Sequence, residues 1–573
     1  MASIAEKLTG ILEEVFVALD LPRELARVQV SGQGQAAQFQ CNGAFQAAKA
    51  ARANPREIAQ KVVDRLGDVS VFSKVEIGGP GFINIDVMDA FIAAHLRETA
   101  AEERLGVSAS GAGQTIVLDY GGPNIAKAMH VGHLRSSIIG DSLRRMYLFA
   151  GFEAIGDVHM GDWGTPMGMI LSELDISGYD GPITMDYLAE IYPKAASACK
   201  EDEVRMALAR EATRKLQDGD VGYTRRWRSF IDVSIAGMKA NFDQLGVHFD
   251  EWKGESDAHP FIAGMIADLK AQGLAVESDG ALVVAVAQDG DKKEIPPLIL
   301  LKSDGAVLYG TTDLATIVER VSAHQPFKIL YIVDQRQALH FEQVFRAARL
   351  GKIAPEGQVD LVHAGFGTMN GPDGKPFKTR AGGVMRLEDL IAQGIEKAQG
   401  RLDEAELAKD MDAGEREAIA QKVAIAALKF ADLQNNRIAD YVFDIDRMTS
   451  FEGKTGPYLL YQAVRIRSLL KKAGWDEAAS ADFVMTDTER ELALLLAEWP
   501  DHFAAALKHD TPHVLCDYAY RLAQEFSSFY GRCHILSEED EALRASRLAL
   551  CALTQKQICM VLALLGIDVP ERM

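Results

Sequence analysis

A strand, a glycine-containing loop, a helix and a second strand follow one another within residues 115–164 of this chain. The apolar, β-rich run at residues 115–120 ends at two glycines and a proline, as expected for a buried parallel strand. From Val131 the apolar residues recur at roughly helical spacing as far as Gly151, and residues 154–158 again have the pattern of a strand. These elements predict a βαβ unit, whose first loop lies at the carboxyl end of the sheet, where such folds bind nucleotides.

Two histidines, His130 and His133, lie at the start of the predicted helix in an H-x-G-H pattern. Unpaired helix amides and imidazole donors are suited to a polyphosphate whose charge moves onto a leaving group. A lone H-x-G-H is also compatible with a helix cap or with a pair of zinc ligands. The strand-to-helix position of this one, with Asn124 and Lys127 just upstream, favours the nucleotide interpretation.

The motif PNIAKAMHVGHLRSS, followed by GDWGTPMG, resembles the first signature of class I aminoacyl-tRNA synthetases in its arginyl form. The lead-in from Asn124 to Lys127 and the G-D-W-G sequel at residues 161–164 distinguish this form from other class I enzymes. The resemblance implies that ATP binds at Gly132, His130, His133 and Lys378. It also implies that catalysis uses His130, His133, Lys127, Lys375 and Lys378.

Composition limits the class of protein. The chain has 573 residues, enough for about three or four domains, and it has no apolar run near the roughly 20 residues of a membrane span. Its six cysteines are scattered without a C-x-x-C pair. We therefore expect reduced thiols, no structural metal site, no membrane association and a cytoplasmic location.

The formal net charge of −21 is unusual for an RNA-binding protein, because phosphate contacts depend on lysine and arginine. A large acidic protein can still carry a local basic surface, and a negative overall field suppresses non-specific binding of RNA. The charge therefore argues against a general nucleic-acid coat protein and leaves binding of a specific RNA open.

Three domains are predicted. Residues 1–110 contain helical stripes and two strand-like runs around GGPGFIN, which resembles the N-terminal appended, tRNA-contacting domain of arginyl enzymes. A small, polar segment, GVSASGAG, precedes a catalytic domain at 111–385 with a Rossmann-like parallel sheet and a helical insertion at about 184–275. Residues 386–573 read as successive helices, and YLLYQAVRIRSLL with LLGIDVPERM resembles the helical anticodon-binding domain. The fold class is thus α/β at the centre, with an α/β appendage and an all-α domain.

Two clusters of basic and aromatic residues allow more than one interpretation. In TRRWRSFI, within the insertion, Trp227 and its neighbouring arginines could touch RNA, but a solvated helix face with one packed tryptophan is favoured. Near the C-terminus, one predicted helix is locally basic and the next carries aromatic rings suited to stacking, most of which we expect in the core. These residues are Arg465, Arg467, Lys471 and Lys472, followed by Tyr518, Tyr520, Phe526, Phe529 and Tyr530.

Four further apolar runs, at 281–287, 298–302, 328–333 and 359–364, are expected to form the second half of the parallel sheet. Tyr309 and Asp313 precede a predicted helix, and Gln337 follows a predicted strand. An aspartate and a tyrosine in such places can be a helix cap and a packed ring. In the arginyl family, residues at these positions hold the amino acid.

A glycine-rich cationic loop, GPDGKPFKTR, carries Lys375 and Lys378 three residues apart, a spacing that can reach a triphosphate. These lysines match the two lysines of the class I K-M-S-K-S motif, while Pro376, Phe377 and Thr379 replace its other residues. In arginyl enzymes a lysine corresponding to Lys127 assists ATP.

The resemblance implies ATP-dependent ligation of L-arginine to its tRNA through an arginyl-adenylate, with release of AMP and pyrophosphate and with Mg²⁺ on the phosphates. It assigns Asp119 and Asp313 to the substrate guanidinium, Tyr309 beside them, and Asn124 and Gln337 to the α-amino group. We expect a monomer that forms the adenylate only when tRNA is bound. Two alternatives are a small-molecule nucleotidyltransferase, which would not need the terminal domains, and a non-catalytic RNA-binding paralogue, which should have lost the active-site residues present here.

Overall fold

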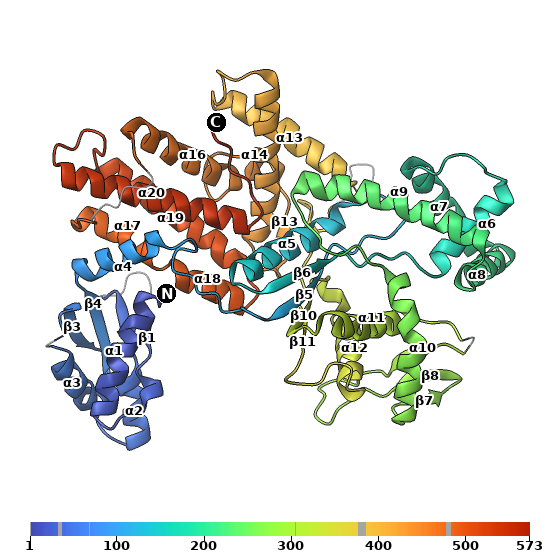
Figure 1. Ribbon diagram of the computed structural model, residues 1–573, viewed down its shortest axis with the longest axis horizontal. Helices are drawn as coiled ribbons and strands as arrows, with labels where there is room; N and C mark the ends of the chain where they lie inside the picture. The colour runs from blue at the N-terminus through green and yellow to red at the C-terminus, as the bar shows by residue number, and fades with distance from the viewer. Residues whose placement is uncertain are drawn as a thin grey trace.

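The computed structural model describes residues 2–573 except 32–36, 68, 304, 376, 378–384 and 477–482. A parallel sheet lies at the centre, with a small N-terminal domain and a group of C-terminal helices on one side and further helices on the other (Figure 1). All six cysteines are free thiols.

The N-terminal domain is an antiparallel four-stranded sheet in the order β1-β2-β4-β3, covered by helices. Ser3 and Glu6 form a capping box at the first helix, and Asn54 caps the third, which has Pro55 in its first turn. The predicted strands around the GGPG turn are confirmed, since β3 and β4 pair across it. The elements are α1 (Ile4–Ala18), β1 (Val28–Val30), β2 (Phe39–Cys41), α2 (Gly43–Ala51), α3 (Pro55–Leu66), β3 (Phe72–Gly78), β4 (Phe82–Val87) and α4 (Asp89–Ala101).

The central sheet has the order β11-β10-β5-β6, and all its neighbouring strands are parallel. Its strands are β5 (Thr115–Asp119), β6 (Glu153–Asp157), β10 (Lys328–Tyr331) and β11 (Asp360–His363). The registers place Asp157, Asp119, Tyr331 and His363 side by side at the carboxyl ends of the four strands. This confirms the predicted βαβ unit and the α/β fold class, and it brings a row of polar residues to one edge of the sheet.

Two of the four later strands do not join this sheet. β8 (Ala281–Val284) and β9 (Leu298–Leu301) pair antiparallel, with β7 (Ala275–Ser278) as the third strand of a separate sheet. The prediction that all four runs complete the parallel sheet was therefore wrong for the first two. The apolar face of this small sheet packs with α10 (Glu255–Ala271), α11 (Tyr309–His324) and α12 (Ala338–Leu350) in a core that also includes residues of β5, β10 and β11.

The segment between the two halves of the parallel sheet is helical, as predicted. It contains α7 (Met185–Glu201), α8 (Glu203–Gln217) and α9 (Val221–Leu245), which follow α6 (Thr165–Ser177). Within TRRWRSFI, the indole Nε1 of Trp227 donates to the carbonyl of Asp162 at 2.8 Å, and Arg226 pairs with Asp175. These contacts agree with a packed tryptophan on a solvated helix.

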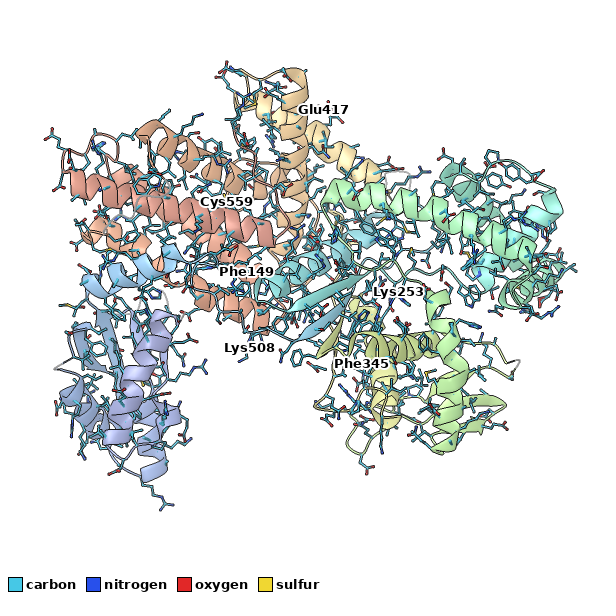
Figure 2. All side chains as sticks on the ribbon, in the orientation of Figure 1. Phe149, Lys253, Phe345, Glu417, Lys508 and Cys559 are labelled. Atoms are coloured by element: carbon cyan, nitrogen blue, oxygen red, sulfur yellow. The ribbon has the colours of Figure 1, made fainter. Side chains whose placement is uncertain are left out.

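The C-terminal helices pack directly onto α5 (Leu134–Phe149), the helix that follows β5. Figure 2 shows Phe149 at this junction, where its ring centroid lies 5.1 Å from that of Phe503. Lys328 at the start of β10 donates to Asp510 at 2.8 Å, which ties the sheet to the same helices. The helices are α13 (Leu387–Glu404), α14 (Ala413–Leu433), α15 (Ile445–Met448), α16 (Gly456–Ala473), α17 (Asp487–Ala497), α18 (Trp499–Lys508), α19 (His513–Arg532) and α20 (Glu541–Leu564).

Of the helices in the described part of the chain, α20 alone has the length and apolar composition that could cross a membrane. In this structure 61% of its most apolar stretch is buried, against neighbours that include α16 and α19, which accounts for that composition. Of the five aromatic residues proposed for stacking, Tyr518, Phe526 and Phe529 are fully buried, as expected for core residues.

Candidate active site

The H-x-G-H segment opens onto a cavity at the carboxyl edge of the parallel sheet. The loop after β5 turns at Gly121, whose φ of 85° lies in the left-handed region that glycine adopts without strain. The Gly121 amide donates to Ser136 Oγ at 2.8 Å, and that hydroxyl donates to the carbonyl of Ile332 at 2.7 Å. The end of β5, the start of α5 and the end of β10 are thereby fixed to one another around a cavity of 440 Å³.

The two histidines are held by the backbone in matching ways. His130 Nδ1 accepts a hydrogen bond from the Gly132 amide, and His133 Nδ1 accepts one from the His130 amide, both at 3.1 Å. Burial, followed by the charge of His130, lowers the pKa of His133 to about 3, and burial with Lys127 lowers the pKa of His130. Both imidazoles are therefore neutral near pH 7, and each carries its proton on Nε2, where it can be donated to a phosphate oxygen.

Gly132 is required by the shape of this turn. A Cβ added to it would lie 2.8 Å from both Nδ1 and Cε1 of His130, closer than real Cβ contacts come. Any other residue would displace the His130 ring, whose centroid lies 4.0 Å from that of His133. The glycine of the motif thus keeps the two rings together.

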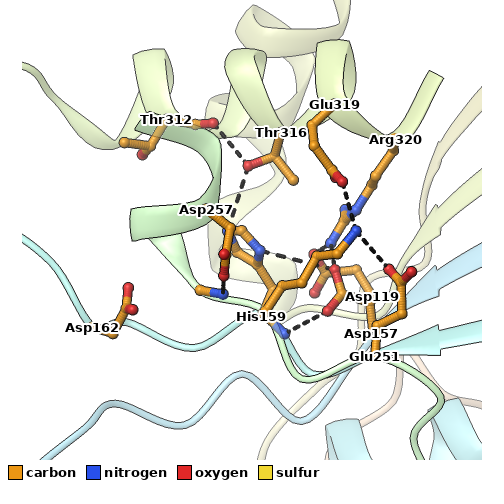
Figure 3. A network of polar contacts seen from close by, with 12 residues as sticks. Asp119, Asp157, His159, Asp162, Glu251, Asp257, Thr312, Thr316, Glu319 and Arg320 are labelled. Carbon is orange, nitrogen blue, oxygen red and sulfur yellow. Dashed lines mark hydrogen bonds and ion pairs between the residues drawn. The ribbon is translucent and has the colours of Figure 1, made fainter. Parts of the chain in front are cut away.

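Asp119, at the end of β5, lines the same cavity, but it already contacts a guanidinium of the protein itself. Its Oδ2 accepts from Arg320 Nη2 at 2.7 Å, and the same nitrogen donates to Asp157 at 2.6 Å. Figure 3 shows Arg320 reaching from α11 toward both carboxylates. Burial raises the pKa of Asp119 despite this partner, whereas for Asp157 the charges of Arg320 and His159 outweigh burial and lower the pKa.

Tyr309 and Asp313 form a second group, at the start of α11. Asp313 accepts a hydrogen bond from His340 at 2.5 Å. Tyr309 is 66% exposed. Close to them lies Glu255, the first residue of α10. Burial, then the charges of Asp162 and Asp313, raise the pKa of Glu255 to about 8, and Glu255 in turn contributes to the raised pKa of Tyr309.

Sequence reasoning missed Glu255 because it lies inside the predicted helical insertion. A signal was present, since Gly254 and Glu255 follow an extended segment and open a helix. In the structure that segment runs parallel to the chain after β6, through the pairs Asp157–Glu251 and Met160–Gly254. It is a second junction of extended chain and helix beside the first, and it places the half-buried carboxylate of Glu255 near Tyr309 and Asp313.

The remaining predicted residues lie at different distances from the cavity. Gln337 lines the cavity with His130, Gly132, His133 and Asp119, whereas Asn124 is exposed and forms a bridge to Gly161. Lys127 Nζ lies 4.6 Å from the ring centroid of Tyr192, in a neighbouring cavity of 200 Å³. Lys375 is exposed, and Lys378 lies outside the described residues.

Comparison with known proteins covers the whole chain. A family model described as tRNA synthetases class I (R), catalytic domain, matches residues 95–445; the DALR anticodon binding domain matches 459–573, and the arginyl tRNA synthetase N terminal domain matches 2–87. Curated relatives named arginine–tRNA ligase include those of Maricaulis maris and Hyphomonas neptunium, 49% and 47% identical over 100% of both chains in each comparison.

Solved structures agree. An arginyl-tRNA synthetase from Plasmodium falciparum has a TM-score of 0.86 and 25% identity, and one from Thermus thermophilus has a TM-score of 0.80 and 23% identity. Each comparison covers 100% of both chains, and the second supports the fold alone. The resemblance seen in the sequence motifs is thereby confirmed. The chain belongs to the arginyl-tRNA synthetase family of class I aminoacyl-tRNA synthetases.

Proposed function

We propose that this protein ligates L-arginine to tRNA at the expense of ATP, through an arginyl-adenylate. The observation that carries the proposal is the pair of neutral histidines at the mouth of a cavity on the carboxyl edge of a parallel sheet, in a member of this family. Such an edge is where open α/β folds bind nucleotides.

In the first step the arginine carboxylate attacks the α-phosphate of ATP in line, forming arginyl-adenylate and releasing pyrophosphate. A carboxylate is already a nucleophile, so this step needs no protein base. His130 and His133 donate from Nε2 to phosphate oxygens as charge accumulates on the leaving group, and being neutral they do so without losing a proton. Lys127, Lys375 and Lys378 supply positive charge to the triphosphate.

Mg²⁺ enters this scheme bound to ATP. Among the described residues no three histidine, cysteine, aspartate or glutamate side chains are grouped so as to hold a metal ion. The phosphate oxygens, which are hard ligands, would hold the ion, and it would supply positive charge that offsets the charge of the leaving pyrophosphate.

In the second step the terminal adenosine hydroxyl of tRNA, the 2′-OH as in other class I enzymes, attacks the arginyl carbonyl and releases AMP. We assign tRNA binding to the N-terminal domain and the C-terminal helices. The protein acts as a monomer in the cytoplasm, where charged tRNA is used in translation.

Selection of arginine requires an anionic pocket, because a guanidinium stays protonated at any physiological pH. We assign this pocket to Glu255 and Asp313, with Tyr309 beside them and with Asn124 and Gln337 left for the α-amino group. Burial, and then the charges of Asp162 and Asp313, raise the pKa of Glu255 in the absence of a bound cation. Bound arginine relieves this repulsion, which favours a cation at the site.

The proposal is tested by exchange of labelled pyrophosphate into ATP with each of the 20 common amino acids, with and without total tRNA. We expect exchange with arginine only. Exchange with a different amino acid would contradict the proposed function. So would the absence of exchange with any amino acid together with turnover of a small-molecule acceptor. Removing residues 445–573 tests this second outcome, because a small-molecule nucleotidyltransferase would keep its activity without them.

A further inference from the structure

Lys127, the lysine just upstream of the H-x-G-H turn, is held by an aromatic ring rather than by a carboxylate. Its Nζ lies 4.6 Å from the ring centroid of Tyr192, a residue of α7 in the helical insertion. Among the described residues, no side chain forms an ion pair or a hydrogen bond with this ammonium group. Asp186 and Glu388 line the same cavity of 200 Å³ without pairing with it. The ammonium therefore keeps its full positive charge beside the active site.

The backbone of this segment is fixed by the insertion as well. Ala126 has a φ of 63°, in the left-handed region that a residue with a Cβ rarely adopts. Its amide donates to the buried hydroxyl of Ser234 on α9 at 3.0 Å, which holds the chain in that conformation. Lys127 is the next residue, so α9 fixes the base of its side chain and α7 holds the tip.

The helix α7 offers a second attraction for a cation next to Tyr192. Pro193 lies inside the helix and has no amide to donate to the carbonyl of Ala189, one turn earlier. Ala189 lines the cavity together with Lys127. A ring face and a carbonyl without its usual donor both attract an ammonium group, and neither of them cancels its charge.

The charge of Lys127 acts on both histidines of the turn. Burial is the main cause of the lowered pKa of His130, and the charge of Lys127 is the second cause. Burial is also the main cause at His133, where the charges of His130 and, more weakly, of Lys127 add to the lowering of the pKa. A lysine whose charge acts on both rings is close enough to act on a phosphate group that contacts them.

We propose that Tyr192 is a positioning residue for adenylate formation, whose ring holds the Lys127 ammonium beside the H-x-G-H turn and free of a counter-charge. Because the lysine has no carboxylate partner, it can move to the triphosphate without leaving an unpaired anion behind. The helical insertion thereby takes part in the use of ATP, in a chain whose loop at 371–380 departs from the K-M-S-K-S pattern. The inference rests on the proposed function, in which Lys127 assists ATP.

The test is a double-mutant cycle in the full-length protein, measured by pyrophosphate exchange with arginine and tRNA at varied ATP concentration. Tyr192→Leu removes the ring, so kcat/KM for ATP should fall by about tenfold, with the KM for arginine within about twofold of wild type. Tyr192→Phe keeps the ring and should restore kcat/KM to within about twofold of wild type. In a Lys127→Gln background, Tyr192→Leu should cause less than about twofold further loss, because the cation that the ring positions is absent.

Tyr223→Leu is the matched control. Tyr223 is a half-buried tyrosine on α9 of the same insertion, and Lys215 Nζ lies 5.4 Å from its ring centroid. It lines neither the cavity of 440 Å³ nor that of 200 Å³. Its kcat/KM for ATP should stay within about twofold of wild type. Thermal unfolding checks that each variant is folded, and Tyr192→Met gives the same ring-free comparison if Tyr192→Leu unfolds.

Equal losses from Tyr192→Leu with and without Lys127 would overturn the inference, because the ring would then act through the packing of α7. It would also be overturned if Lys127→Gln exchanged pyrophosphate like wild type, or if Tyr192→Phe lost as much activity as Tyr192→Leu. A rise in the KM for arginine alone would place Tyr192 at the amino-acid pocket and contradict the inference. Absence of arginine-dependent exchange in the wild-type protein would instead contradict the proposed function.

Discussion

At the scale of single residues, the proposed mechanism uses the two histidines of the H-x-G-H turn as neutral donors. If His133 donates to phosphate mainly in the transition state, His133→Ala should lower the adenylation rate by roughly 100-fold and change ATP affinity little. Its pKa of about 3 also predicts that no loss of rate near pH 6.5 arises from its protonation. Pre-steady-state adenylate formation measures the rate. His248→Ala is the control, since the side chain of His248 is 63% exposed. An ATP affinity that falls in parallel with the rate would argue for ground-state binding.

A second residue-scale prediction concerns Glu255, whose pKa is raised to about 8 in the free protein. A raised pKa keeps the carboxyl protonated below pH 8, and only the ionised form attracts a guanidinium. The kcat/KM for arginine, which reports the free enzyme, should therefore rise by up to about tenfold per pH unit between pH 6 and 8 and level off above. Steady-state charging assays across this range measure it.

Two variants separate this titration from others in the site. Glu255→Gln should lower kcat/KM for arginine and remove the rising limb. Asp313→Asn removes a charge that raises the pKa of Glu255. It should therefore also weaken the binding of arginine, but it should shift the rising part of the kcat/KM profile to lower pH. A flat profile in the wild-type protein would show that Glu255 does not bind arginine as the ionised form.

The predictability of the site also differs from residue to residue. His130, Gly132 and His133 were found from sequence because one turn brings them together over four positions. Arg320 lies 201 positions from Asp119 and 163 from Asp157, and no local pattern connects them. Its only signal was an arginine on the buried face of an amphipathic helix.

At the scale of elements, α5 is joined to the C-terminal helices by a buried ion pair next to the histidines. Arg135 Nε contacts Asp432 of α14 at 3.1 Å, and its other nitrogens donate to the carbonyls of Ala439 and Arg437. The two side chains are 3% and 0% exposed. The start of the catalytic helix therefore depends on a residue nearly 300 positions later.

Asp432→Asn should destabilise this junction by about 3 to 5 kcal/mol, because it leaves the Arg135 guanidinium buried without a counter-charge. Scanning calorimetry should show a lower midpoint for the transition that includes α5 and α14. Arg135→Gln/Asp432→Asn, which removes both charges, should recover part of the loss. Asp446→Asn is the control, since it disrupts an exposed pair with Lys397 and should leave the midpoint unchanged. A midpoint that does not move in Asp432→Asn would show that the pair contributes little.

Elements were predicted better than their partners. The runs that became β8 and β9 were recognised as strands because apolar β-rich residues favour that conformation in any sheet. The choice of sheet depends on which elements cover each face, and here α10, α11 and α12 lie in one core with both the parallel sheet and the separate sheet of β7, β8 and β9. A period of two residues carries no information about this choice.

At the scale of the whole molecule, both terminal domains contact one another as well as the centre. Arg490 of α17 pairs with Asp89 of α4 and donates to the carbonyl of Val87, so the N-terminal domain is attached to the C-terminal helices. In Figure 1 the N-terminal domain lies beside these helices, away from the helical segment α6–α9. A tRNA bound by both domains, as we propose, would thus lie along the side of the protein away from α6–α9.

The cationic loop is connected to the C-terminal helices through the backbone. β12 (Met369–Asn370), directly before the loop that carries Lys375, pairs in parallel with β13 (Tyr441–Val442), which follows α14. Arg437 donates to the carbonyls of Gly365 and Asp510, which extends the connection to the segment between α18 and α19. Any shift of these helices on binding tRNA would be transmitted to the strand that positions Lys375.

We therefore expect pyrophosphate exchange with arginine to depend on tRNA. A stimulation of about 100-fold corresponds to about 2.7 kcal/mol of coupling, within the range seen between two sites of one protein. Exchange assays with and without tRNA measure the stimulation. A tRNA that lacks its terminal adenosine cannot accept arginine, so exchange in its presence reports activation of arginine alone. Arg437→Gln should reduce the stimulation and leave tRNA affinity within about threefold. Equal exchange with and without tRNA would show that the loop is positioned without help from the C-terminal helices.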